Sequence, residues 1–159
     1  MAGLRWSFAG VKPKELDVFH FSADSEIERI GRGVLERTLP KPEWTHAAHF
    51  AAAFWVLTRP DMDAVRDMPG LIRAYNEATG VLNTDTTGYH ETITQVSLRA
   101  ARAWLRERPA LALFEALNGL LASEYGRSEW LLTYWSKPVL FSVTARRTWV
   151  DPDVRPLPF

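Results

Sequence analysis

The sequence predicts an all-α protein that folds as one compact bundle of about five to six helices. In residues 89–106, apolar side chains recur every three to four positions, which is the period of an amphipathic helix. Residues 46–57 are apolar on every side apart from two histidines, as expected for a helix in the middle of a bundle. The chain has 159 residues, and 47% of them are apolar, which is enough for the core of one domain.

We expect a single helical domain over residues 1–159. Residues 1–23 combine glycine, proline and aromatic side chains without a helical period, and they predict an extended arm. Residues 24–147 contain the helical segments. Residues 148–159 are rich in proline, which cannot continue a helix, and they predict an extended tail.

The first helix is expected to begin near Asp24 or Ser25, because both residue types are good N-caps. It should end before Pro40. Gly31 and Gly33 weaken this helix, since glycine has a low helix propensity.

The second helix is expected from Pro42 to Leu57, because proline suits the first position of a helix. Residues 61–79 predict either two short helices or one helix broken at Pro69, with Gly80 as the C-terminal stop.

Residues 83–88 are polar and turn-rich, and they predict a loop before the helix at 89–106. The polar side of that helix is typical of a solvated face, and it consists of Gln95, Arg99, Arg102 and Arg106. A further helix is expected from 109 to 121, followed by short helical pieces at 129–135 and 143–147.

Composition disfavours several classes of function. Nineteen basic and nineteen acidic residues cancel, so nucleic acids and membrane surfaces are not expected partners. The sequence has no cysteine, which excludes disulfides, thiolate nucleophiles and cysteine-bound metals. No signal-peptide pattern or membrane-length apolar run is present, so we expect a cytoplasmic protein. The oligomeric state is not predictable from these features.

Three histidines form the chemically most specific feature of the sequence. His46 and His49 are three residues apart and therefore lie on one face of their predicted helix, with small Ala53 one turn further along. His90 begins the helix at 89–106. If these two helices pack near their N-terminal ends, the three imidazoles could bind a divalent metal such as iron or zinc and leave a coordination position open. The alternative is that each histidine has a structural role, with its ring nitrogens hydrogen-bonded in the core.

Two acidic residues are candidate catalytic groups beside His90. Glu91 could act as a general base or support a metal ligand, although it also suits the first turn of a helix. Asp85 could orient an imidazole, although aspartate is also common in turns.

A pocket for an apolar small molecule is also expected near the histidines. Trp44, Tyr75 and Tyr89 are its candidate lining residues together with Ala53, because aromatic rings combine a large contact area with a polar edge. Aromatic residues at helical spacing are also common in plain hydrophobic cores.

Three segments carry a resemblance. They are LPKPEWTHAAHF at 39–50, YNEATGVLNTDTTGYHETIT at 75–94 and LLTYWSKPVLFSVTARRTWVDPD at 131–153. Their shared pattern, WTHxxH followed by GYHETIT, resembles a recurring group of small all-α bacterial proteins. The resemblance implies a helical fold, and it implies no activity, cofactor or functional residue for this chain.

Three functional hypotheses follow. The first is a small helical protein that binds a divalent metal through His46, His49 and His90 and acts on a small molecule. The second is a non-catalytic module that binds a ligand or another protein and has structural histidines. The third is a metal-free enzyme that uses a histidine for acid–base chemistry.

Overall fold

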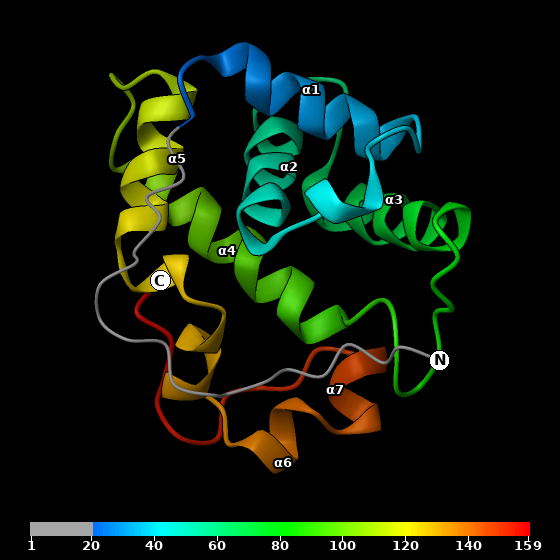
Figure 1. Ribbon diagram of the computed structural model, residues 1–159. Coiled ribbons are helices and arrows are strands. Elements are labelled where there is room, and N and C mark those ends of the chain that lie inside the picture. Colours follow the sequence, from blue (N-terminus) through cyan, green and yellow to red (C-terminus); the bar gives the residue numbers. More distant parts are fainter. Residues whose placement is uncertain (1–20) are drawn as a thin grey trace, which may run out of the picture.

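The apolar helix that carries His46 and His49 forms the centre of the structure. In the computed structural model this helix is α2, His46–Thr58, and every residue from Phe50 to Val56 is buried. Four other helices contact it, and they are α1 (Asp24–Leu35), α3 (Ala64–Ala78), α4 (Glu91–Arg106) and α5 (Leu113–Ala122). Figure 1 shows these helices around α2. The alanines of α2 allow this packing, because small side chains let helices approach closely.

The structure describes residues 21–159, so the arm predicted for residues 1–23 lies outside the described residues apart from its last three positions. The described residues contain seven α-helices and no strand, which confirms the all-α class and slightly exceeds the expected number of helices. The shorter elements are η1 (Lys41–Glu43), η2 (Glu124–Gly126), η3 (Ser128–Thr133), α6 (Lys137–Leu140) and α7 (Val143–Arg147). No described helix has the length and apolar character needed to cross a bilayer.

The second helix begins later than predicted. Pro42 lies in the 3-10 turn η1, and Thr45 is the N-cap of α2, where its side-chain oxygen accepts a hydrogen bond from the backbone N–H of Ala48. This bond satisfies one of the free N–H groups at the helix start. The next predicted helix also begins later, because the chain from Pro109 to Ala112 forms a turn before α5.

Gly31 is required by packing in spite of its low helix propensity. It lies in α1 against the ring of Trp55 in α2, and a Cβ atom at this position would overlap that ring. The glycine therefore lets α1 lie close to α2, and tertiary packing compensates for the weak local preference.

The predicted break at Pro69 is wrong, because α3 continues through this residue. A proline in a helix lacks the N–H that would bond the carbonyl four residues earlier, here that of Val65. In the structure Gln95 of α4 supplies the missing donor, and its Nε2 lies 3.3 Å from the oxygen of Val65. Gln95 is consequently buried, which corrects its predicted place on a solvated face.

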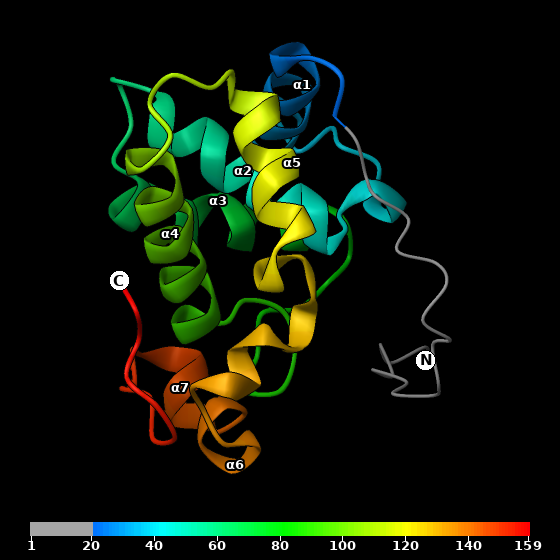
Figure 2. The same ribbon diagram turned by 90° about the vertical axis from the view of Figure 1, so that its left-hand side faces the viewer.

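The C-terminal third of the chain covers the N-terminal end of α4. Figures 1 and 2 show α6 and α7 beyond this end. The side-chain hydroxyl of Thr92 donates to the carbonyl of Thr148 at 2.9 Å and accepts from the N–H of Val150 at 3.2 Å. Residues 148–159 form neither helix nor strand, yet their backbone is held against the body by these bonds and by a bond from Val154 to Tyr134.

Candidate functional site

His90 is the N-cap residue of α4. Its Nδ1 accepts a hydrogen bond from the N–H of Ile93 at 3.3 Å, and its Nε2 lies 2.9 Å from the carbonyl oxygen of Leu140. A carbonyl can only accept, so Nε2 carries the hydrogen and the ring is neutral. Burial lowers the pKa of His90 to about 4, against the bond to Leu140, and the charge of Arg146 lowers it further. Both ring nitrogens are therefore occupied.

The two histidines of α2 have separate partners. The Nε2 of His46 lies 2.8 Å from the carbonyl of Tyr125 in η2. The exposed His49 stacks on Trp44 with 3.7 Å between ring centroids, and its Nδ1 lies 2.7 Å from the carbonyl of Thr45. Desolvation lowers the pKa of His49, whereas its bond to the carbonyl of Thr45 raises it.

The three histidines do not form the expected metal site. Within residues 21–159 no group of three or more His, Asp or Glu side chains could hold a metal ion. His46, His49 and His90 each use a ring nitrogen to bind a different backbone carbonyl. This arrangement matches the interpretation that all three are structural.

The two candidate carboxylates are also engaged. Glu91 accepts a hydrogen bond from the hydroxyl of Tyr89 at 2.6 Å. Asp85 forms a two-point ion pair with Arg147, with both N–O distances at 2.7 Å, and so connects the loop before α4 to α7. Neither carboxylate bonds a histidine in the described structure.

The four predicted pocket residues pack against other residues of the protein. Ala53 is buried in α2. Tyr75 is fully buried and donates to the carbonyl of Leu39, while half-buried Trp44 contacts its ring. Tyr89 is buried under the guanidinium of Arg73, and burial raises the pKa of its hydroxyl, as does the bond to Glu91. None of the four lines either of the two cavities described next.

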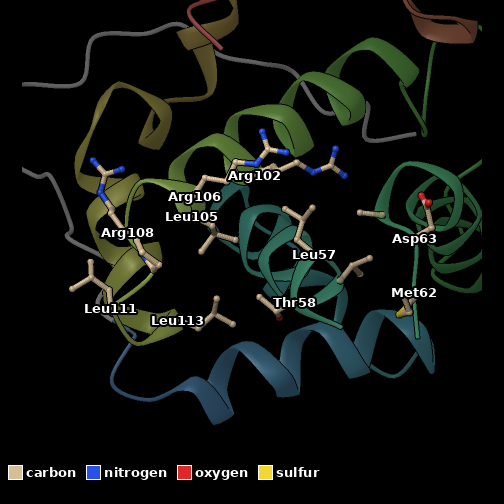
Figure 3. Close-up of a pocket in the computed structure, with 13 residues that line it drawn as sticks. Leu57, Thr58, Met62, Asp63, Arg102, Leu105, Arg106, Arg108, Leu111 and Leu113 are labelled. Atoms are coloured by element: carbon tan, nitrogen blue, oxygen red, sulfur yellow. The ribbon is translucent and has the colours of Figure 1, made fainter. Parts of the chain in front are cut away.

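A cavity of about 560 Å³ lies between the C-terminal ends of α2 and α4 and the start of α5. Its apolar part includes Leu57, Leu105 and Leu113. Three arginines also line it, and they are Arg102, Arg106 and Arg108. Figure 3 shows the guanidinium groups of Arg102 and Arg106 on one side of the leucines. The cavity is open to solvent, and its volume and its mixture of apolar and charged groups are compatible with a small ligand.

Arg102 and Arg106 differ from the other charged residues of this cavity. Neither side chain has an ion pair, hydrogen bond or ring contact with any residue in 21–159. Arg108, by contrast, donates to the carbonyl of Trp104 and to Glu107. Asp63 accepts from the N–H of Arg66 as the N-cap of α3. The cavity is thus lined by two arginine side chains that have no ion pair with any residue in 21–159.

Sequence reasoning missed this cavity because the arginines were assigned to a solvated face. That face divides into three parts in the structure. Gln95 is buried, whereas Arg99 and Arg106 are exposed as predicted and Arg102 is half-buried. Arg99 stacks over Trp149 at 3.8 Å, and Arg102 with Arg106 lines the cavity. One feature of the sequence pointed to this cavity. Arg102 and Arg106 have the i, i+4 spacing that places them on one face of the helix, with Leu105 between them and the helix end directly after them.

A second cavity, of about 420 Å³, lies between Arg99 and residues 149–157. Its carboxylates are occupied: Asp151 accepts from the indole of Trp149, and Asp153 accepts twice from Ser136. The first cavity is therefore the better candidate for a ligand site.

No protein-family model, curated protein or solved structure matches this chain. The geometry of the chain itself therefore carries the functional inference.

Proposed function

We propose that this protein is a non-catalytic binding module for a small molecule that has an apolar part and an anionic group. The ligand lies in the cavity between α2, α4 and α5. Its apolar part packs on Leu57, Leu105 and Leu113, and its anionic group faces Arg102 and Arg106. This is the second of the three hypotheses from the sequence, with the binding surface moved from the aromatic residues to the arginines.

One observation carries the proposal: two arginines that line a partly apolar cavity have no ion pair among the described residues. A guanidinium presents a rigid fork of donors that fits carboxylate and phosphate oxygens. Placing an anion there would satisfy both groups, and leucine side chains next to them favour a ligand with an apolar part.

The bonding of His90 supports a binding role over a catalytic one. The histidine nitrogens bond the carbonyls of Tyr125, Thr45 and Leu140, which leaves His90 without a free nitrogen for a metal or a proton transfer. The nearby carboxylates, Glu91 and Asp85, are bonded to Tyr89 and Arg147.

Titration calorimetry with octanoate tests this function, with backbone amide shifts to locate the site. We expect saturable 1:1 binding, with the largest shifts around Leu57, Leu105 and Leu113. The double variant Arg102→Gln/Arg106→Gln should weaken binding by about tenfold or more, since hydrogen bonds to charged groups contribute about 1.5–3 kcal/mol each. Arg127→Gln is the matched control, because Arg127 is exposed and lies outside the cavity.

The proposal is overturned if octanoate, octanol and octyl phosphate all fail to bind the folded protein. It is also overturned if binding maps elsewhere and the double variant binds as well as the Arg127→Gln control.

A further inference from the structure

The charge of the cavity indicates which anionic group the ligand carries, and this inference rests on the proposed function. We infer that the anionic group is a phosphate monoester. The inference starts from the two unpaired guanidinium groups, which lie one turn apart on α4 and face the same cavity.

None of the remaining charged groups of the cavity forms an ion pair with these arginines. Asp63 is used as the N-cap of α3, where it accepts from the N–H of Arg66. Arg108 is held over the ring of Trp104, at 3.5 Å from the ring centroid, and bonds Glu107. Arg102 and Arg106 together carry a charge of +2 that is not ion-paired within residues 21–159, and the carboxylate of Asp63 also lines the cavity.

A phosphate monoester matches this charge better than a carboxylate does. It carries about −1.5 to −2 charges at pH 7 and has three acceptor oxygens. A carboxylate carries one charge, and a single arginine can satisfy both of its oxygens. Side chains at i and i+4 of a helix are about 5–6 Å apart at Cβ, so two long arginines can reach one tetrahedral group.

The helix dipole does not explain why both arginines lie at this end of α4. Cations near a helix C-terminus are favoured, but this effect falls off within the last turn. Arg106 lies in the last turn of α4, whereas Arg102 lies one turn earlier. Arg102 is also half-buried, and placing a charge in partly desolvated surroundings has a cost that a bound anion would offset.

The apolar walls identify an ester rather than free inorganic phosphate. Leu57, Leu105 and Leu113 come from three different elements and line the same cavity as the two arginines. Inorganic phosphate would leave these leucines uncovered, while an alkyl chain or ring attached to the phosphate would bury them.

Competition titrations at pH 7.5 with octyl phosphate, octanoate, octanol and inorganic phosphate test the inference. We expect octyl phosphate to bind at least tenfold more tightly than octanoate, and inorganic phosphate to bind more weakly than either. Arg102→Gln and Arg106→Gln should each remove most of the preference for phosphate and leave octanol binding unchanged. Arg127→Gln should keep the full preference.

Equal affinities for octyl phosphate and octanoate would overturn the phosphate monoester and leave the proposed function intact. Failure of every octyl compound to bind would overturn both. A preference that survives in Arg102→Gln/Arg106→Gln would place the phosphate elsewhere and contradict the inference.

Vesicles that contain phosphatidic acid separate the two sources of such a ligand. Co-sedimentation that depends on Arg102 and Arg106 identifies a lipid as the source. Binding of octyl phosphate without co-sedimentation identifies a soluble phosphate ester. Both outcomes support the same head-group chemistry.

Discussion

At the scale of single residues, His90 shows how local bonding determines the role of an ionisable side chain. One nitrogen accepts from Ile93 and the other donates to Leu140, so the ring joins the start of α4 to α6. Its position at the start of a helix could be predicted from the sequence. Its partner Leu140 could not, because the two residues are 50 positions apart and nothing in the sequence indicates that they meet.

His90 should make stability dependent on pH between about 6.5 and 4. Its pKa is lowered by burial from 6.5 to about 4, so the unfolded chain binds a proton in this range and the folded chain does not. The free energy of unfolding is therefore unaffected by this titration above pH 6.5. It decreases as the pH falls, because the unfolded chain takes up the proton, and His90 causes no further change below about pH 4. A shift of this size corresponds to roughly 3 kcal/mol. Urea unfolding at several pH values measures it.

His90→Asn is the informative variant, since an asparagine oxygen can still accept from Ile93 as an N-cap but cannot titrate. At pH 7.5 it should be less stable by about 1–3 kcal/mol, because Leu140 loses its donor. This deficit should shrink as the pH falls to 4. Paired carboxylates act at lower pH, since Arg66 lowers the pKa of Asp67 to about 2. A deficit that stays constant from pH 7.5 to 4 would contradict this role of His90.

At the scale of elements, α3 and α4 show where local rules fail. The proline rule predicted a break at Pro69, and the helix continues because Gln95 of the neighbouring helix bonds the carbonyl of Val65. The same contact explains why Gln95 is buried on the polar side of an amphipathic helix. Helix periodicity gave the positions of α2 and α4, but a bond between two helices is a property of their packing and has no signature in either segment.

A double-mutant cycle at Pro69 and Gln95 tests this compensation. Gln95→Leu alone should lower the free energy of unfolding by about 1–3 kcal/mol, because the carbonyl of Val65 is left without a donor. In the background Pro69→Ala, the alanine N–H can bond that carbonyl within the helix. Gln95→Leu should then cost clearly less, with a coupling energy of about 1 kcal/mol or more. Additive effects of the two substitutions would show that Gln95 does not compensate for the proline.

At the scale of the whole molecule, the fold was more predictable than the site. The apolar circumference of α2 indicated a central helix, and its contacts with α1, α3, α4 and α5 agree with that interpretation. The candidate site was not predictable, because its cavity joins residues 56–64 around the end of α2 to residues 102–113, which are distant in sequence. The conspicuous histidines instead drew attention to residues that bond carbonyls, whereas the ordinary-looking Arg102 and Arg106 have no such partner in residues 21–159.

The C-terminal segment should be part of the stable core of the molecule. The half-buried ring of Trp149 packs edge-on against buried Trp135, with 5.9 Å between centroids, and Arg99 of α4 lies over its face. Trp149→Ala should therefore lower the free energy of unfolding by about 2–3 kcal/mol, somewhat less than a fully buried tryptophan would. Val154→Ala in the same segment should change it by less than about 0.5 kcal/mol, since Val154 is 59% exposed. Urea unfolding of both variants measures the difference. Equal stability of the two variants would mean that residues 148–159 lie on the surface without contributing to the core, whereas the expected difference means that Trp149 stabilises the core.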